Sequence, residues 1–282
     1  MKQRILVAVV GVPVLLAVLV AAPDWATAIL VSLLSIVGAH ELLTAVCGAA
    51  KTRRWFWISA TMGVALVWMV YWQAPQFDGT SMDVAGTFFL FVLTALIVGT
   101  FILAVVEYGG AQPMMFTDIC AVLVAGFVIP GALSCLLRLR LLPDGNGLVM
   151  IPLVAAFCSD TMALFAGMAC GKHKLAPKVS PKKTVEGAIG GLLGGMLGMV
   201  IFRIIFQLCT LRPLNILWCL LLGLVGAAMG QLGDLSFSLV KREYGIKDYG
   251  RLLPGHGGVL DRFDSVIFTA PIVWIIMSCV TL

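Results

Sequence analysis

The chain has 282 residues, of which 61% are hydrophobic and only 12% charged, and its mean hydropathy is +1.05. Because an ordinary soluble domain has about a quarter of its residues charged, this composition excludes a water-soluble globular protein and indicates a polytopic membrane protein. The net charge of +5 then bears on membrane orientation and anionic lipid headgroups, and no basic patch with interleaved aromatic residues points to nucleic acid.

Apolar runs long enough to cross a bilayer recur along the whole chain. A helix needs about 20 apolar residues to cross about 30 Å of hydrocarbon, and these runs lack the alternation that a membrane β-barrel needs. We therefore predict an all-α, polytopic integral membrane protein that forms a single membrane domain. Nine transmembrane helices are expected, at residues 5–22, 26–49, 55–75, 86–106, 118–137, 147–170, 187–209, 214–233 and 265–282.

The basic residues between these runs predict the orientation. Nine spans place the two termini on opposite sides, and most Lys and Arg residues fall in segments on the side of the N-terminus. Because basic loops stay on the cytoplasmic side, we predict that the N-terminus and the loops at 171–186 and 234–264 are cytoplasmic. The first apolar run is longer than that of a usual signal peptide, which favours an uncleaved span.

Four acidic residues lie in or beside the predicted spans, and each can have a structural or a functional role. His40-Glu41 in the second span is not followed by the second histidine of the HExxH zinc-protease motif, so a polar pair facing the bundle interior is favoured over a catalytic role. Asp160 lies within the sixth span, where an ionisable residue costs roughly 2.5–3.5 kcal/mol unless it is paired or hydrated. It either ties helices together or forms the wall of a substrate-binding polar cavity. Glu107 and Asp118 are expected to be solvated at helix ends.

A basic loop precedes the seventh span and ends in the motif SPKKTVEG at residues 180–187. Thr184 can cap the next helix, and Glu186 in its first turn complements the helix dipole, so both have a structural reason to be present. Lys182 and Lys183 have no such reason, and they precede a helix N-terminus, which favours a phosphate. We expect them to bind a substrate phosphate; the alternative is a loop that only anchors the chain on the cytoplasmic side.

Glycines form two rows in the seventh span, each repeating every fourth residue. One row is Gly187, Gly191 and Gly195, and the other is Gly190, Gly194 and Gly198. Such rows let another helix backbone approach closely, either within the chain or in a homodimer. Small residues of the eighth span could supply the facing surface.

The stretch from Gln231 to Asp264 is polar, although it lies between two strongly apolar runs. It holds ten charged residues in a chain with only 19 basic and 14 acidic residues. Carboxylates are the hard ligands that suit Mg²⁺, and basic side chains bind phosphate oxygens. The stretch therefore predicts a metal and polyphosphate site. Its candidate residues are Asp234, Asp248, Asp261 and Asp264 for the metal, and Lys241, Arg242, Lys247, Arg251 and Arg262 for phosphate.

A specific pattern runs through this stretch. It reads Ser238-x-Val240-Lys241-Arg242, four residues, Lys247-Asp248-x-Gly250, two residues, and then Leu253-Pro254-x-His256-Gly257-Gly258-Val259-x-Asp261-Arg262-Phe263-Asp264. The pattern resembles the signature of the phosphatidate cytidylyltransferases, the CDP-diacylglycerol synthases, without a departure. The resemblance extends upstream through Asp160 and the 180–187 motif, so it covers the C-terminal half, about residues 147–282. The N-terminal half is similar only in spanning the membrane.

The resemblance implies a membrane nucleotidyltransferase of phospholipid biosynthesis. The phosphate of phosphatidate would attack the α-phosphorus of CTP, giving CDP-diacylglycerol and pyrophosphate. The implied cofactor is Mg²⁺, alone or with a second cation, on Asp234 and Asp261. Asp264 and Asp248 are the next candidate ligands, and the alternative for them is an ion pair with Arg262 and Lys247. The expected catalytic residues are Asp234, Asp261, Lys241, Arg242, Lys247, Asp248, His256 and Arg262, and the expected substrate-binding residues are Ser180, Lys182, Lys183, Asp160, Ser238, Gly257 and Gly258.

Two other functions stay open from the residues alone. One is a transporter for an ion or a phosphorylated solute, with Asp160, Asp234 and Asp261 as intramembrane ligands, and the other is a kinase or transferase for a polyprenyl lipid. Against the transporter, the charge is concentrated in a long loop, and the two halves show no evident inverted repeat.

The expected partners are CTP, phosphatidate and the bilayer. The expected location is a bacterial plasma membrane, because no N-terminal extension precedes the first run, with the active site facing the cytoplasm.

Overall fold

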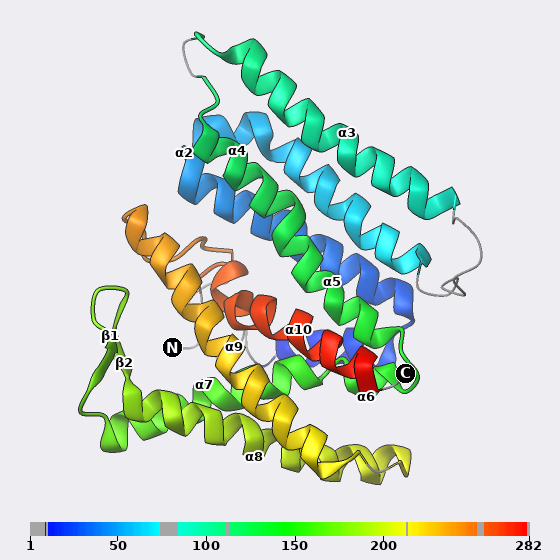
Figure 1. Cartoon of the computed structure of the whole chain (residues 1–282), viewed down its shortest axis with the longest axis vertical. Helices are drawn as coiled ribbons and strands as arrows, with labels where there is room; N and C mark the ends of the chain where they lie inside the picture. The colour runs from blue at the N-terminus through cyan, green and yellow to red at the C-terminus, as the bar shows by residue number, and fades with distance from the viewer. Residues whose placement is uncertain are drawn as a thin grey trace. The chain divides into compact units, whose positions relative to one another are not determined.

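The computed structural model describes residues 9, 11–73, 84–110, 113–212, 214–252 and 257–280. Helices account for nearly all of its regular structure, which confirms the predicted all-α membrane class (Figure 1). A small antiparallel β-hairpin was not predicted. The helices are α2 (Asp24–Gln73), α3 (Val84–Glu107), α4 (Phe116–Leu123), α5 (Ile129–Arg140), α6 (Gly145–Leu148), α7 (Ile151–Cys170), α8 (Val185–Thr210), α9 (Ile216–Glu243) and α10 (Leu260–Val280), with π-helical turns at Ala17–Ala21 and Val124–Val128 and strands β1 (Lys174–Ala176) and β2 (Ser180–Thr184).

Within the described residues, seven helices are long and apolar enough to cross a membrane. The predicted count of nine is not confirmed. α2 covers both the second and the third predicted spans, and it is interrupted at Gly48, where φ is 80° and ψ is 160°. The first predicted span corresponds to a shorter apolar helix at Gly11–Ala21, and its beginning lies outside the described residues.

The chain divides into two compact units. The first contains residues 1–18, 22–141 and 248–261, and the second contains residues 19–21, 142–247 and 262–282. The division falls within α10, between Asp261 and Arg262. The single membrane domain expected from the sequence stays a prediction.

In the first unit, α2 packs against α3, α4 and α5, and ion pairs fasten α2 to its neighbours. Lys51 Nζ lies 2.6 Å from Asp118 Oδ2, and Arg54 lies 3.0 Å from Glu107. Asp118 is only 4% exposed and also accepts a hydrogen bond from the Met115 amide, which caps α4. The expectation of a solvated Asp118 is therefore wrong, because a lysine 67 residues earlier supplies the charge that makes its burial tolerable.

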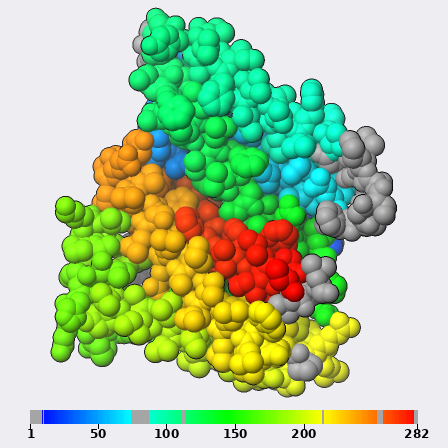
Figure 2. Space-filling model, in the orientation of Figure 1, coloured from blue at the N-terminus to red at the C-terminus, as the bar shows by residue number. Residues whose placement is uncertain are grey.

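In the second unit, α8 packs against both α7 and α9, and the glycine rows make both contacts close. A Cβ on Gly194 would collide with Met162 of α7. A Cβ on Gly195 would lie 2.6 Å from both Ala227 Cβ and Gly223 O of α9. Figure 2 shows α8, yellow-green to yellow, against α9, yellow to orange. Packing within the chain thus accounts for the glycine rows: α7 packs on Gly194, and α9 packs on Gly195.

The β-hairpin joins α7 to α8, and its ends are fixed at the first turn of α8. The strands pair antiparallel, with Lys174 opposite Thr184. Thr184 Oγ1 accepts from the Gly187 amide at 3.1 Å, which confirms the predicted N-cap. Glu186 accepts from the amides of Lys172 and His173, and its Oε1 lies 2.6 Å from His173 Nδ1. These contacts hold the basic hairpin at the start of α8.

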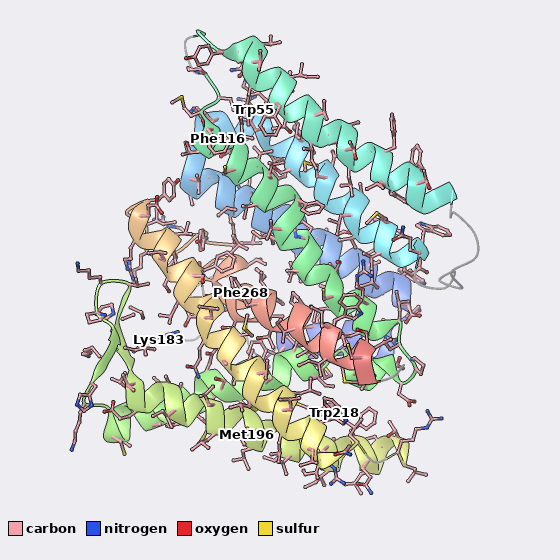
Figure 3. The ribbon with its side chains drawn as sticks, viewed as in Figure 1. Trp55, Phe116, Lys183, Met196, Trp218 and Phe268 are labelled. Atoms are coloured by element: carbon pink, nitrogen blue, oxygen red, sulfur yellow. The ribbon has the colours of Figure 1, made fainter. Side chains whose placement is uncertain are left out.

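The part of α10 in the second unit packs closely on α9. Thr269 Oγ1 donates to Gly226 O at 3.1 Å, and a Cβ on Gly233 would collide with Asp264 O. Nearby, the rings of Phe237 and Phe268 meet edge to face with centroids 6.4 Å apart; Figure 3 labels Phe268 on α10. Small residues on α9 therefore bring the two backbones together where the carboxylates of α9 and α10 lie.

Gly195→Ala should destabilise the protein by about 1–3 kcal/mol, because the added methyl group has no room against α9. Gly99→Ala is the matched control: it lies within α3 with nothing within 4 Å of the new Cβ, so it should be neutral or slightly stabilising. Unfolding of the two variants in the same detergent measures the difference. Equal effects would contradict the packing of α8 on α9.

Candidate functional site

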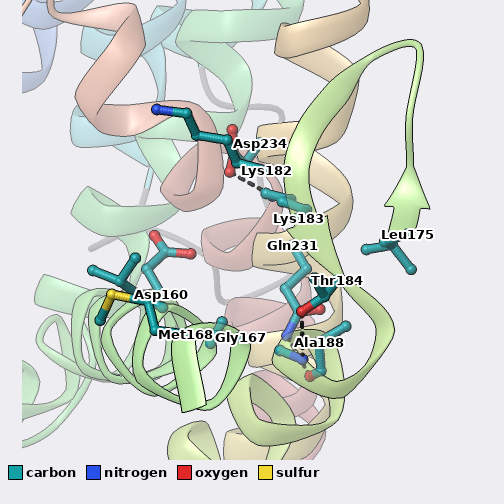
Figure 4. Close-up of a pocket in the computed structure, with 13 residues that line it drawn as sticks. Asp160, Gly167, Met168, Leu175, Lys182, Lys183, Thr184, Ala188, Gln231 and Asp234 are labelled. Carbon is teal, nitrogen blue, oxygen red and sulfur yellow. Dashed lines mark hydrogen bonds and ion pairs between the residues drawn. The ribbon is translucent and has the colours of Figure 1, made fainter. Parts of the chain in front are cut away.

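A pocket of about 460 Å³ opens in the second unit between α7, the hairpin, α8 and α9 (Figure 4). Its polar lining comes from Asp160, Lys182, Lys183, Gln231 and Asp234. Its other wall is apolar and includes Ala163, Leu164, Met168 and Leu175. The pocket thus combines acidic and basic groups with a hydrocarbon surface, which suits a molecule that is charged at one end and apolar at the other.

An ion pair joins the hairpin to α9 inside this pocket. Lys183 points from β2 toward α9, and its Nζ lies 2.5 Å from Asp234 Oδ2 (Figure 4). The other oxygen of Asp234 accepts from Ser238 Oγ, one turn further along α9, at 3.3 Å. A second contact is the hydrogen bond from Arg242 Nε to Val179 O at 3.1 Å. Two links therefore hold the basic hairpin against the C-terminal half of α9.

Three carboxylates of the second unit come near one another from three helices. Asp160 of α7, Asp234 of α9 and Asp264 of α10 interact electrostatically. Ser265 Oγ lies 3.4 Å from both Asp160 Oδ2 and Asp264 Oδ1, so its single proton can serve either carboxylate. Asp160 thus both lines the pocket and contacts α10, so the two roles considered for it from the sequence are not exclusive.

Two lysines offset this negative charge. Lys183 pairs with Asp234 directly, and the charge of Lys241 acts on Asp264. Lys241 lies on α9 and is only 8% exposed. Because a buried ammonium group is unfavourable without an opposite charge nearby, its burial agrees with the acidic surroundings.

Gln231 is a pocket residue that the sequence analysis did not single out. Its Nε2 donates to Ser159 Oγ at 3.2 Å and to Ala188 O at 3.0 Å, which ties α9 to α7 and α8. A Cβ on Gly191 would lie 2.5 Å from this nitrogen, so the glycine leaves the space that the amide needs. The sequence signal that could have identified Gln231 is a polar residue in an apolar span that faces the glycine row of the neighbouring span.

Asp261 belongs to the first unit, where backbone amides hold its carboxylate. Oδ2 accepts from the amides of Tyr249 and Gly258, both at 2.9 Å. Gly257 has a φ of 86°, which favours glycine, and it lies where a Cβ would press on Asp261. Gly258 was expected to bind substrate, and its amide donates within the protein instead.

The predicted site residues divide between the units. Asp234 and Asp261 lie in different units, so their cooperation in one site stays a prediction. His256 lies outside the described residues. Of the predicted site residues, the second unit contains Asp160, Ser180, Lys182, Lys183, Asp234, Ser238, Lys241, Arg242, Lys247, Arg262 and Asp264, and the first contains Asp248, Gly257, Gly258 and Asp261.

The donor groups of the pocket meet what Mg²⁺ requires only in part. In the part of the chain that the structure describes, no group of three or more His, Cys, Asp or Glu residues is arranged to hold a metal. Mg²⁺ does not need one, because it usually takes one or two carboxylates and completes its shell with water and substrate phosphates. Asp234, which lines the pocket with an oxygen-only side chain, fits this requirement.

Comparison with known proteins places the chain in a family. The model of the cytidylyltransferase family matches residues 2–280. The chain belongs to this family. A phosphatidate cytidylyltransferase of Bacillus subtilis (strain 168) is 33% identical over 99% of this chain and 98% of its own length. One of Pseudomonas aeruginosa (strain PAO1) is 32% identical over 96% of this chain and 95% of its own length, and an uncharacterised protein of Escherichia coli (strain K12) is 32% identical over 93% and 82%.

Replacing Lys183 by Met should loosen the hairpin, because the tether to Asp234 is lost. Trypsin should then cut several-fold faster after Lys178, an exposed residue beyond the end of β1, since cleavage follows local opening. Asp234→Asn should act in the same direction. Lys247→Met, which removes an exposed lysine after α9, is the control and should leave this cleavage unchanged. Unchanged cleavage in Lys183→Met would show that the ion pair does not hold the hairpin.

Proposed function

We propose that this protein is an integral membrane phosphatidate cytidylyltransferase of phospholipid biosynthesis. It transfers a cytidylyl group from CTP to phosphatidate and yields CDP-diacylglycerol and pyrophosphate. One observation carries the proposal: a chain of the cytidylyltransferase family, similar over nearly its whole length to proteins of this name, has a pocket with both charged and apolar walls.

The apolar wall of the pocket supports a lipid substrate. Leu164 and Met168 of α7 line the pocket and are 61% and 66% exposed. An exposed apolar surface on a membrane-spanning helix is stable against hydrocarbon and not against water. The diacylglycerol part of phosphatidate would lie along this wall, while its phosphate would reach the polar lining of the same pocket.

Lys182 and Lys183 would bind the phosphate groups. A phosphate monoester is already ionised at neutral pH, so the attacking oxygen needs no general base. It forms a bond to the α-phosphorus of CTP while the bond from that phosphorus to the bridging oxygen of the β-phosphate breaks, and pyrophosphate leaves. The two lysines would offset the phosphate charges as they approach one another, and Lys183 would exchange its contact with Asp234 for one with phosphate.

Asp234 and Asp261 would hold Mg²⁺, alone or with a second cation, and Asp264 is the next candidate ligand. The metal would offset the charge of the triphosphate and of the departing pyrophosphate. Asp264 is 7% exposed and accepts from its neighbour, the Ser265 amide, at 2.8 Å, so it is less accessible to a substrate-bound ion than Asp234. Arg242, Lys247 and Arg262 are exposed and would bind the leaving phosphates.

The active site would face the cytoplasm of a bacterial inner membrane. The hairpin and the C-terminal half of α9 contact each other through Lys183–Asp234 and Arg242–Val179. This arrangement agrees with the expectation that both basic loops lie on one side of the membrane. The relatives reported above are bacterial proteins.

The purified protein should form a CDP-lipid from CTP and phosphatidate in detergent micelles, and this should require Mg²⁺. Asp234→Asn and Asp261→Asn should each lower turnover at least about 100-fold, because Asn keeps one oxygen ligand but removes the charge that holds Mg²⁺ against water. Pyrophosphate release against Mg²⁺ concentration measures both effects.

Asp248→Asn serves as the comparison, because Asp248 is exposed and a milder loss is expected there. Unfolding temperatures of the variants separate lost chemistry from lost folding. Near-normal turnover and Mg²⁺ dependence in both Asp234→Asn and Asp261→Asn would remove the metal assignment. The absence of any CDP-lipid from the wild-type protein would remove the proposed reaction.

Single cysteines at Lys178 and Arg251, in a variant without the eight native cysteines, should both react with a membrane-impermeant maleimide only from the cytoplasmic side. The reason is that basic loops are retained on that side. Labelling in intact cells and in inverted vesicles distinguishes the two faces. Reaction of the two positions from opposite faces would contradict a single cytoplasmic site.

A further inference from the structure

Glu41 is a buried carboxylate that the proposed reaction does not use. It lies on α2 in the first unit and is 4% exposed. Its two oxygens accept hydrogen bonds from two consecutive backbone amides: Val259 N lies 3.0 Å from Oε1 and Leu260 N lies 2.9 Å from Oε2. These amides are at the start of α10, more than 200 residues further along the chain.

The start of α10 needs such a partner. The first amides of a helix have no carbonyl acceptor within it, and a Ser, Thr, Asp or Asn at the N-cap usually supplies one. α10 begins at Leu260 and is preceded by Val259, whose apolar side chain cannot accept a hydrogen bond. Glu41 supplies both the acceptor oxygens and a negative charge at the positive end of the helix dipole.

The loop before α10 leaves room for this carboxylate. A Cβ on Gly250 would collide with Glu41 Oε1, and a Cβ on Gly258 would lie 2.5 Å from both Glu41 oxygens. Glycine is therefore required at both positions as long as Glu41 occupies this place. Gly250 and Gly258, which both belong to the first unit, thus lie directly against the side chain of Glu41.

The same loop also holds Asp261, one of the two residues assigned to the metal. Asp261 Oδ2 accepts from the amide of Gly258, whose next two residues donate their amides to Glu41. It also accepts from the amide of Tyr249, next to Gly250. The backbone from which Asp261 projects is therefore fixed by Glu41, and the direction of its carboxylate is fixed by amides of the loop that Glu41 holds.

We propose that Glu41 is a positioning residue for Asp261. Its carboxylate, on a different helix, holds the first amides of α10 so that Asp261 keeps the orientation required for its task. The catalytic consequence rests on the proposed function, whereas the structural consequence, a rigid start of α10, does not. A neutral side chain of the same size cannot replace the Glu41 carboxylate. The amide group of Gln offers only one acceptor oxygen, and it directs an N–H donor at the other backbone amide.

The test compares Glu41→Gln with Asp118→Asn in the full-length protein. Asp118 is the matched control, because it is also 4% exposed, lies in the first unit and caps a helix, but at α4. Hydrogen exchange of the peptide that contains Val259 and Leu260 should become at least about ten-fold faster in Glu41→Gln, since its amides lose a buried acceptor. Asp118→Asn should leave exchange of this peptide unchanged.

Pyrophosphate release against Mg²⁺ concentration provides the second measurement. Glu41→Gln should need about ten-fold more Mg²⁺ for half-maximal rate, with little change in the KM for phosphatidate, because a displaced Asp261 binds the ion less well. Asp118→Asn should lower the unfolding temperature without changing the Mg²⁺ requirement. If Glu41→Gln does not fold, Gly250→Ala replaces it in both measurements. The methyl group added in Gly250→Ala pushes the Glu41 carboxylate aside, while the side chain of Glu41 keeps its negative charge.

Normal exchange at Val259 and Leu260 would overturn the proposal, because Glu41 would then not hold the helix start. Faster exchange with an unchanged Mg²⁺ requirement would overturn it as well, since Glu41 would then cap α10 without positioning Asp261. Failure of the proposed function is a separate result: the wild-type protein would form no CDP-lipid. In that case hydrogen exchange alone decides. If exchange of the peptide that contains Val259 and Leu260 is slow only when Glu41 is intact, the positioning role of Glu41 is supported. If its exchange does not depend on Glu41, the positioning role is overturned.

Discussion

Carboxylates held among apolar helices are the constraint on which the rest of this structure depends. An ionised side chain within a membrane-spanning helix costs roughly 2.5–3.5 kcal/mol unless other groups compensate it. Lys51 compensates Asp118, Lys183 compensates Asp234, and Glu41 receives two backbone amides. Each partner lies on an element distant in the sequence, so these polar contacts join elements that are far apart along the chain.

Glycines make these polar contacts geometrically accessible. Gly191 leaves room for the Gln231 amide, which joins α9 to α7 and α8. Gly250 and Gly258 leave room for Glu41. In both places a methyl group would fall on a hydrogen-bonding atom, so the absence of a side chain is as necessary as the polar group itself. Small residues therefore serve the polar contacts here as well as the close packing of helix backbones.

The sequence was sufficient for features that depend on composition and on neighbouring residues. The membrane class follows from the apolar runs, and the Thr184 cap follows from a threonine placed directly before a predicted helix. Contacts between distant residues could not be derived in this way. Asp118 was expected in water because nothing local indicated Lys51, and Glu41 was assigned only to the bundle interior because Val259 lies 218 residues later. The helix count also remained unconfirmed, since the long α2 changes direction at Gly48 without a loop.

Asp234 and Asp261 differ in how firmly the protein holds them, and this difference bears on their proposed roles. Side chains hold Asp234: the ammonium group of Lys183 and the hydroxyl of Ser238, each of which can turn away without moving a helix. Backbone amides hold Asp261, and they cannot leave it unless the loop itself moves. In the proposed reaction, an incoming phosphate would compete for Lys183 and would free Asp234 Oδ2 from its ion pair. Asp261 would keep its orientation during this exchange, because its carboxylate accepts from backbone amides and Glu41 accepts from the amides of Val259 and Leu260 beside it.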